Sequence, residues 1–145
     1  MKESAGVAII WKGKILIAHP KSASWYRTYT PPKGGMEKEE TLIDAAIRET
    51  KEEVGIQVKK KDLLAPIEIP YNNQKGVTYK MVTLFPMLIK QLSEIDLKSE
   101  KVPLSQLQLE EVDDARFMSP EEFKERVLPR YYEPLKQLIE KYTMK

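Results

Sequence analysis

Two short apolar runs near the start of the chain predict a β-hairpin. Residues 5–11 (AGVAIIW) and 14–18 (KILIA) are almost continuously hydrophobic, and a turn containing Gly13 separates them. Continuous hydrophobicity over so few residues is typical of strands that are buried on both faces, and glycine suits a tight hairpin turn. Residues 21–30, which follow the second run, are polar and aromatic without a period. We expect them to form a loop over a functional site.

A helical pattern follows between Thr41 and Gly55. Threonine is a good N-cap and glycine commonly ends a helix, so the expected helix covers residues 41–54. Thr50 is the one polar member of its apolar stripe, and its hydroxyl is expected to bond to the carbonyl of Ala46, one turn earlier. Four residues at helical spacing make up this stripe; they are Ile43, Ile47, Thr50 and Val54.

The second half of the chain predicts another hairpin. Residues 64–70 and 77–90 have the composition of strands, and residues 72–76 between them (NNQKG) are typical of a turn. Pro86 indicates an edge position or a bulge, because proline has no amide hydrogen to donate within a sheet. Residues 91–109 have a mixed composition and a weak period. We interpret them as a long connection whose role the pattern does not explain.

Two helices are predicted at the end of the chain. Ser119, Pro120 and Glu122 supply an N-cap, a first-turn proline and a capping-box acid, which predict a helix over residues 119–127. A last helix is expected to begin between residues 129 and 134. Its apolar stripe has the spacing i, i+3, i+4 and i+7, and it consists of Leu135, Leu138, Ile139 and Tyr142.

Composition and charge limit the class of protein. With 145 residues, of which 41% are hydrophobic and 32% charged, the chain has the composition of one globular domain over residues 1–145. The net charge of +2 argues against broad electrostatic binding of nucleic acid, so no stable nucleic-acid complex is expected. The chain has no cysteine for redox chemistry. No apolar run suits a signal peptide or a membrane span, so we expect a cytoplasmic protein without membrane contacts.

The predicted helix over residues 41–54 also carries an acidic face. Glu49, Glu52 and Glu53 fall within about a third of its circumference, roughly opposite the apolar stripe. Like charges at these spacings repel and weaken a helix, so the cluster calls for a compensating partner. Carboxylate oxygens suit a hard divalent cation such as Mg²⁺ or Mn²⁺. A solvated acidic helix face is the alternative interpretation.

The residues around this helix favour the metal site. Residues 34–56 (GGMEKEETLIDAAIRETKEEVGI) resemble the Nudix hydrolase box closely. Thr50 departs from the pattern, since the family usually has an aliphatic residue there; threonine keeps a β-branched shape close to that of valine. The matching positions are Gly34, Glu40, Arg48, Glu49, Glu52, Glu53, Gly55 and Ile56.

The resemblance implies a fold, an activity and a set of site residues. The fold is an α/β/α sandwich with a mixed β-sheet, and the activity is Mg²⁺-dependent hydrolysis of a phosphoanhydride bond, with Mn²⁺ as a possible substitute. Many family members carry a further acid before an aromatic residue and a helix start, which Glu111 matches, with Glu110 as the second choice. The general base is then a box glutamate or an acid near Glu111. The catalytic residues that the resemblance implies are Glu49, Glu52, Glu53 and Arg48, and the arginine orients the glutamates. The implied metal ligands are Glu49, Glu52, Glu53, Glu111 and Gly34.

The expected substrate is a small nucleotide. Lys33 precedes two glycines that allow a phosphate to approach the backbone, and Lys80 is a second cation for a leaving group. The lead-in Pro-Lys-Gly-Gly is similar to that of Nudix members acting on dinucleoside polyphosphates. Four aromatic residues are candidates to stack a base, although packing is the commoner use of such residues; they are Trp25, Tyr26, Tyr29 and Tyr79.

Several alternatives stay open at this point. ADP-ribose and nucleotide sugars, a triphosphorylated RNA end and inositol pyrophosphates are other substrates, and a sensor domain that binds nucleotides without hydrolysis is another class. Such domains commonly lose box glutamates, whereas this chain keeps all of them. His19 is a candidate base or substrate contact, but a single histidine at a strand end is more often only positioned there.

Overall fold

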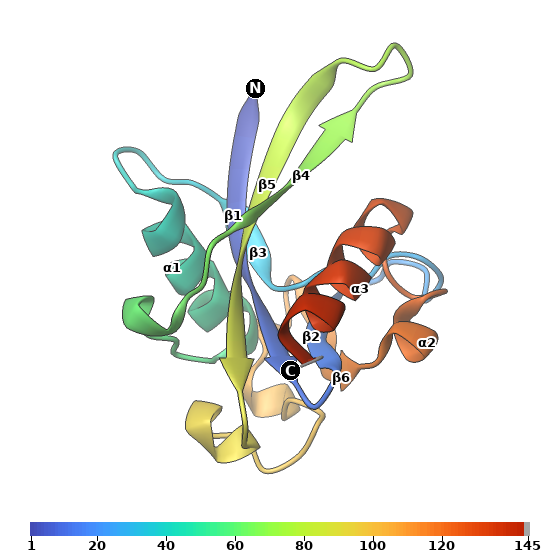
Figure 1. The fold of residues 1–145 in the computed structure, drawn as a ribbon. Helices are drawn as coiled ribbons and strands as arrows, with labels where there is room; N and C mark the ends of the chain where they lie inside the picture. Colours follow the sequence, from blue (N-terminus) through green and yellow to red (C-terminus); the bar gives the residue numbers. More distant parts are fainter. Residues whose placement is uncertain (144–145) are drawn as a thin grey trace.

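The computed structural model describes residues 1–143, and within them six strands form one mixed sheet with the order β4-β5-β1-β2-β6, β3 pairing with β1. Helices lie on both sides of this sheet (Figure 1). The strands are β1 (Lys2–Trp11), β2 (Lys14–Pro20), β3 (Lys33–Gly35), β4 (Ile67–Asn72), β5 (Thr78–Ile89) and β6 (Val112–Met118). The helices are α1 (Leu42–Val54), α2 (Pro120–Phe123) and α3 (Pro129–Thr143), with short 3₁₀ turns at Lys60–Asp62, Leu92–Ile95 and Leu104–Gln106.

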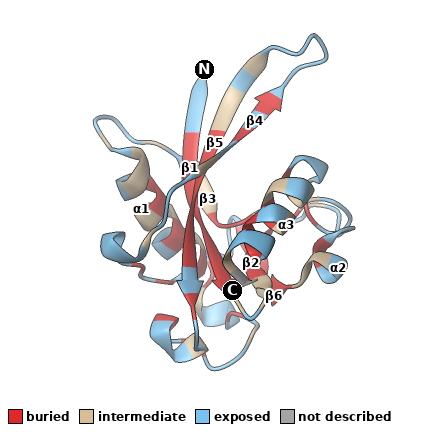
Figure 2. Ribbon diagram, in the orientation of Figure 1, coloured by how far each residue is buried: buried red, intermediate tan, exposed pale blue. Residues whose placement is uncertain are grey.

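Strand β1 is the centre of the sheet. It pairs with β5 in parallel and with β2 and β3 in antiparallel. Successive side chains of a strand point to opposite faces, and those of β1 supply both halves of the core: Val7 and Ile9 pack on the α1 side, Ala8 and Ile10 on the α3 side. Buried residues run along β1 and the middle of β5 between the two helical layers (Figure 2). The predicted α/β/α sandwich with a mixed sheet is confirmed, as is the first hairpin.

The caps of α1 agree with the sequence. The hydroxyl oxygen of Thr41 accepts a hydrogen bond from the Asp44 amide at 3.2 Å, and Gly55 ends the helix in the left-handed conformation with φ 67°. The Thr50 hydroxyl is buried and donates to the Ala46 carbonyl at 2.8 Å, as expected. Ala45 and Ala46 are buried as well, whereas the predicted stripe residues Ile43 and Ile47 are only partly buried. The buried face is therefore centred slightly away from the predicted stripe.

The second hairpin forms as predicted, but β4 begins at Ile67 and not at residue 64. The Leu64 amide instead donates a single hydrogen bond to the Pro86 carbonyl at 2.8 Å. Strand β5 lies between β4 and β1, so Pro86 is not on an edge strand of the sheet. At Pro86, however, β4 has not yet begun, because its first residue pairs with Leu84. The missing amide hydrogen is thus tolerated at a locally open edge.

The predicted helix over residues 119–127 is wrong in length. Ser119 and Glu122 form the expected reciprocal capping box, but α2 ends at Phe123. The Arg126 carbonyl accepts hydrogen bonds from the amides of Thr28 and Tyr29, and Val127 forms a bridge with Tyr29. The chain therefore leaves the helix in order to pair with the loop over residues 21–30, a contact that local sequence does not encode.

Part of the connection over residues 91–109 belongs to the hydrophobic core, and another part covers an edge strand of the sheet. Ile95, Leu97 and Val102 are buried in the α1-side cluster. Residues 100–102, which we call the strap, lie along the outer edge of β6: the Val102 amide donates to the Ala115 carbonyl, and the Phe117 amide donates to the Glu100 carbonyl, both at 2.9 Å. The strap thus covers an edge strand that would otherwise present unpaired backbone groups.

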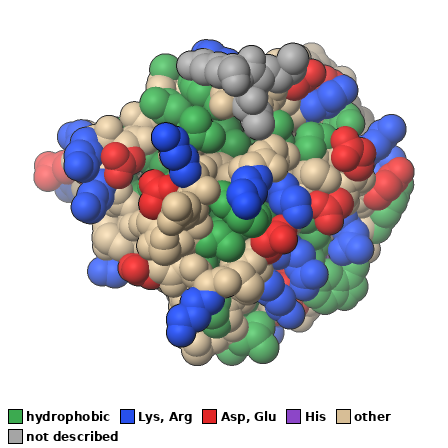
Figure 3. Space-filling model, turned by 60° about the horizontal axis from the view of Figure 1, so that its bottom comes forward, with side chains coloured by type: hydrophobic (Ala, Val, Ile, Leu, Met, Phe, Trp, Pro, Cys, Tyr) green, Lys and Arg blue, Asp and Glu red, His purple; other side chains and the backbone are tan. Residues whose placement is uncertain are grey.

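The surface carries both signs of charge. On the face shown in Figure 3, Lys and Arg side chains alternate with Asp and Glu side chains. This mixture agrees with the small net charge of the chain, +2. Within residues 1–143, no helix has both the length and the apolar character needed to cross a membrane.

Candidate active site

The glutamates of α1 meet β3 at close range. A Cβ atom added to Gly34 would lie 2.1 Å from Cδ of Glu49, so only glycine leaves room for this carboxylate. On the next turn of the helix, Glu53 Oε1 accepts a hydrogen bond from the Lys33 amide at 3.3 Å. The turn before the helix and the acidic face of the helix therefore form one unit. The structure brings together Lys33, Gly34, Glu49 and Glu53, as the sequence predicted.

Arg48 organises the acidic face. Its guanidinium donates to Glu40 at 2.7 and 2.9 Å, to Glu49 and Glu52 at 3.0 Å each, and to the Gly35 carbonyl at 2.9 Å. The hydrogen bond from Arg48 is the main reason why the pKa of Glu40 lies below its ordinary value. The Arg48–Glu52 contact was expected from the i, i+4 spacing. These contacts hold the side chains of Glu49 and Glu52 in fixed positions.

The carboxyl groups of Glu53 and Glu49 have pKa values above their ordinary value. Burial raises the pKa of Glu53 to about 7; the nearby Lys33 opposes this shift, and the carboxylates of Glu49 and Glu111 add to it. Burial also raises the pKa of Glu49, against the effect of Arg48, and repulsion from Glu52 and Glu111 again contributes. Carboxyl groups that raise one another's pKa are close enough to share a cation.

Glu111 joins the cluster from the loop before β6. Together with Lys33, Glu53 and Val112 it lines a cavity of about 180 Å³. Glu110, the second choice of the sequence analysis, is exposed and does not line this cavity. The predicted proximity of Glu111 to the box glutamates is therefore present in the fold.

The chemistry of these donors fits a hard divalent cation. The site offers several carboxylates, which are ligands that Mg²⁺ and Mn²⁺ prefer. Burial is the main cause of the raised pKa values of Glu49 and Glu53, and repulsion between neighbouring carboxylates adds to it. Arg48 forms ion pairs with one carboxylate oxygen of Glu49 and one of Glu52. Within residues 1–143, accordingly, no three acidic or histidine side chains are already arranged around a common metal position.

A group of cations lies beside the acids. Burial lowers the pKa of Lys80, and the neighbouring charges of Lys33, Lys2 and Arg130 lower it further. Lys80 Nζ lies 4.9 Å, and Arg130 Cζ 3.8 Å, from the centre of the Tyr71 ring. Within residues 1–143, none of these four cations has a carboxylate within ion-pair distance. This cationic group, defined as Lys2, Lys33, Lys80 and Arg130, has charge available for an anion.

The cationic group and the box share a cavity. It has a volume of about 660 Å³, and Lys2, Gly35, Glu40 and Lys80 are among the residues that line it. Tyr79 is half exposed nearby, with its ring edge-on to that of Tyr71 at 6.4 Å. The structure thus brings the predicted residues Lys33, Tyr79 and Lys80 into one region.

Arg130 and Tyr71 were missed by the sequence analysis. Tyr71 had only a weak signal, because it lies between the predicted strand over residues 64–70 and the predicted turn over residues 72–76. Arg130 had none: it lies in the first turn of the last helix, and only the packing of α3 against β4 brings it to Tyr71. A contact across 59 positions of the chain cannot be inferred from local pattern.

The aromatic residues of the loop over residues 21–30 differ in burial. Tyr29, a predicted candidate to stack a base, is instead buried and donates to Asp114 at 2.6 Å, whereas Trp25 and Tyr26 are exposed. Trp25 stacks on His19 with ring centres 3.8 Å apart. His19 is fully buried, its Nδ1 lies 2.5 Å from Asp113 Oδ1, and its Nε2 lies 3.0 Å from the Ser24 carbonyl oxygen. Tyr26 is exposed beside the guanidinium of Arg27. Neither Trp25 nor Tyr26 lines the two cavities beside the box, and their contact with substrate stays a prediction.

A mixed sheet between helices, with a glycine turn packed against an acidic helix, defines a Nudix-type hydrolase acting on acid anhydrides. The profile of the NUDIX domain matches residues 2–142, and the chain belongs to this family.

Three proteins illustrate the likeness. The chain is 32% identical over 125 residues to a probable DHNTP pyrophosphohydrolase of Lactococcus lactis subsp. cremoris, a match that covers 83% of this chain and 68% of that protein. A bifunctional NMN adenylyltransferase/ADP ribose pyrophosphatase of Francisella tularensis, solved with AMP and a Mn ion, has the same fold with a TM-score of 0.71 at 19% identity, over 97% of this chain and 41% of that one. An Ap4A hydrolase of C. elegans has a TM-score of 0.65 at 23% identity, over 99% and 96%.

Proposed function

We propose that the protein is a Mg²⁺-dependent hydrolase of a phosphoanhydride bond in a nucleoside polyphosphate, with a dinucleoside polyphosphate as the first choice. One observation supports this most: the acidic cluster on α1 lies directly beside the cationic group, whose members make no ion pair with a carboxylate within residues 1–143. Lys33 joins the two, since its amide binds Glu53 and its ammonium faces Lys80. A metal-binding half next to an anion-binding half suits a substrate that carries several phosphates.

The acidic half would hold the cation. We assign its ligands to Glu49, Glu52, Glu53, Glu111 and the backbone of Gly34, with Mn²⁺ as a possible substitute for Mg²⁺. When bound, the cation supplies charge neutralisation at the phosphates and lowers the pKa of the attacking water. Arg48 positions the Glu49 and Glu52 carboxylates through hydrogen bonds of 3.0 Å. Its role is to orient ligands, not to contact the reacting atoms.

The chain also supplies a proton acceptor for the water. Glu53 is well placed for this, because it faces the cavity that it shares with Lys33 and Glu111. A carboxylate of Glu53, or alternatively of Glu111, takes the proton while the water oxygen attacks phosphorus. The bond from that phosphorus to the bridging oxygen then breaks. Lys33 and Lys80 stabilise the charge on the departing phosphate.

The cationic half would recognise the rest of the substrate. Lys80 and Arg130 flank Tyr71, so phosphates bound to both cations would run along this ring. Tyr79, exposed next to it, offers a surface on which a base could stack. A dinucleoside polyphosphate carries both features, a phosphate chain and a second base.

Two of the similar proteins suggest alternative substrates. The Lactococcus protein is named for DHNTP and the Francisella protein for ADP ribose, and these compounds share a phosphoanhydride with the preferred substrate. An RNA 5′ end and inositol pyrophosphates are further candidates. A sensor without hydrolysis is disfavoured, because Glu49, Glu52 and Glu53 are all retained.

The test is a substrate panel with Mg²⁺, in which products are identified by mass. It contains Ap4A, DHNTP, ADP-ribose, a triphosphorylated RNA and an inositol pyrophosphate. We expect the highest kcat/KM for Ap4A, and we expect the double variant Lys80→Gln/Arg130→Gln to raise KM for it about tenfold or more, since charge-assisted contacts to phosphate are lost. Lys60→Gln, an exposed lysine outside both halves, is the matched control. A higher kcat/KM for a compound without a polyphosphate chain would reject the substrate assignment, and no turnover of any member would reject hydrolysis.

A further inference from the structure

A second cavity lies at the β6 edge of the sheet, away from the box. It has a volume of about 390 Å³, and its walls come from the strap, from β6, from α2 and from Arg126. It shares no lining residue with the two cavities beside the box. Three residues of β6 line it, Arg116, Phe117 and Met118. No acid of α1 is among its lining residues, so the cavity is separate from the acidic helix.

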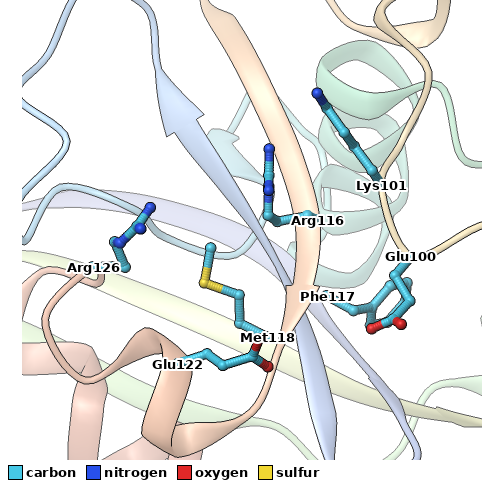
Figure 4. A pocket seen from close by; sticks show the side chains of 7 residues that line it. All are labelled: Glu100, Lys101, Arg116, Phe117, Met118, Glu122 and Arg126. Carbon is cyan, nitrogen blue, oxygen red and sulfur yellow. The ribbon is translucent and has the colours of Figure 1, made fainter.

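Three cationic side chains gather at one end of this cavity. Figure 4 shows the nitrogen atoms of Lys101, Arg116 and Arg126 in the upper half of the view, and the carboxylates of Glu100 and Glu122 in the lower half. Between them, the thioether of Met118 forms part of the floor. The polar groups are thus sorted by sign across the cavity.

The cationic end has more positive than negative charge. Asp114 lies beside Arg116; it is buried and accepts two hydrogen bonds from Arg116 at 2.9 Å and one from the Tyr29 hydroxyl at 2.6 Å. Burial alone would raise the pKa of Asp114, but Arg116 and Tyr29 hold it below its ordinary value, so this carboxylate is fully engaged. Within residues 1–143, Lys101 and Arg126 have no carboxylate within ion-pair distance.

The acidic end is compensated in part. Lys14 makes an ion pair with Glu100, and its Nζ lies 3.9 Å from a carboxylate oxygen of Glu122. The Glu122 carboxylate also accepts the Ser119 amide at 2.9 Å as part of the α2 capping box. Lys14, Lys101, Arg116 and Arg126 together face three carboxylates, those of Glu100, Glu122 and Asp114, so one positive charge is in excess. The excess lies at the end of the cavity with Lys101 and Arg126, beside the guanidinium of Arg116, which Asp114 holds in place.

We infer that this cavity is an accessory binding site for a phosphate group. Lys101 and Arg126, which make no ion pair within residues 1–143, supply positive charge, and the fixed guanidinium of Arg116 offers a donor with the planar geometry that phosphate oxygens accept. The apolar floor and the volume leave room for a group attached to the phosphate. Free inorganic phosphate and the phosphate of a nucleoside monophosphate share this chemistry. The site does not depend on hydrolysis at the box.

The test is an NMR titration of the full chain with inorganic phosphate and, separately, with AMP. Shifts of the amides of residues 100–102 and 116–118 report on this cavity, whereas those of residues 33–35 report on the box. We expect saturable shifts at the first set in the wild-type protein, and about tenfold weaker binding or none in Lys101→Gln/Arg126→Gln, because the two cations without an ion-pair partner are removed. Arg116 is left in place, since its loss would leave Asp114 buried without its partner.

Lys98→Gln, an exposed lysine close to the strap, is the matched control and should bind as the wild type does. Melting temperatures of both variants verify that they fold. Equal affinity for phosphate and AMP assigns free phosphate as the ligand, and tighter binding of AMP assigns a nucleotide. Absence of shifts at residues 100–102 and 116–118 with either probe would overturn the site, as would equal affinity in the wild type and the double variant.

Discussion

Single side chains in this protein are placed by partners far away in the sequence. Asp114 illustrates this, since it holds Arg116 on its own strand and Tyr29 from a distant loop. Glu53 illustrates the opposite case. Two neighbouring carboxylates, those of Glu49 and Glu111, raise its pKa, and Lys33 is the one cation among the groups that shift it. The first arrangement stabilises the fold, and the second suits a site that awaits a ligand.

Replacing Glu53 by glutamine separates catalysis from folding. Glutamine keeps the shape but loses the negative charge, so we expect kcat to fall roughly 10²–10⁴-fold, the usual range for loss of a general base. Repulsion from Glu49 and Glu111 is relieved at the same time, so the melting temperature should be unchanged or higher. Glu121→Gln, an exposed acid on α2, is the control and should keep wild-type turnover. Wild-type kcat in Glu53→Gln would show that the site is misassigned.

Replacing Asp114 by asparagine should lower stability in a way that depends on pH. The folded-state pKa of Asp114 lies below its ordinary value of 3.8, so its contribution is present at neutral pH and disappears as pH falls through the folded pKa. We expect a loss of about 2–3 kcal/mol in the free energy of unfolding at pH 7, from the charged hydrogen bonds.

The difference between the Asp114→Asn variant and the wild type should shrink below pH 4, as measured by urea unfolding. Asp62→Asn, an exposed acid, should unfold like the wild type throughout. A difference that stays constant down to pH 2 would show that charge at Asp114 does not matter.

The sequence predicted the site residues that lie close together in the chain. Glu49, Glu52 and Glu53 follow from helical spacing, and Lys33 and Gly34 from the turn before the helix. Arg130 and Tyr71 were not predicted, because the docking of α3 against β4 creates their contact. The roles of Trp25 and Tyr26 could not be decided either, since an aromatic residue in a loop has the same pattern whether it packs or binds.

Among the elements, β3 and α1 depend on each other most closely. The strand is only three residues long, yet its middle residue lies against a carboxylate of the helix. The capping residues of α1 were visible in the sequence because caps are local. The early end of α2 was not, because the backbone of the loop over residues 21–30 competes for the residues that would have continued the helix.

Adding one methyl group to β3 tests this dependence. In Gly34→Ala the new Cβ would overlap Glu49, with Cδ 2.1 Å away, so the carboxylate must move. Displacement of a catalytic group by about 1 Å costs roughly 10²-fold in rate, and we expect a fall in kcat of that size. The matched control is Gly35→Ala, whose Cβ would have nothing within 4 Å. Equal kcat in the two variants would argue against a requirement for the Glu49 position.

For the molecule as a whole, activity should require a divalent cation. The acids of α1 and Glu111 repel one another, and Arg48 and Lys33 compensate them only in part. Excess EDTA should therefore abolish turnover of the best substrate, and Mg²⁺ or Mn²⁺ should restore it. The control is the circular dichroism spectrum in EDTA, which should remain that of the folded protein. Undiminished turnover in EDTA would exclude metal-assisted hydrolysis.

The layered fold was predictable in outline, because apolar runs and amphipathic helices have clear periods. The order of strands in the sheet was not, and neither was the strap. Both depend on contacts between distant segments. That residues 1–145 form one domain remains a prediction, and its last two residues lie outside those described.

The central position of β1 has a consequence for how the protein is made. Strand β1 leaves the ribosome before β5, its residues 4–10 are buried in the final sheet, and β5 covers one of its edges along its whole length, with Lys2 beside Lys80 and Trp11 beside Ile89. At roughly 5–20 residues per second, β5 emerges on the order of several seconds after β1. During translation β1 can be covered only by β2 and β3, on its other edge. The nascent chain therefore carries an apolar strand with one open edge until β5 has been synthesised.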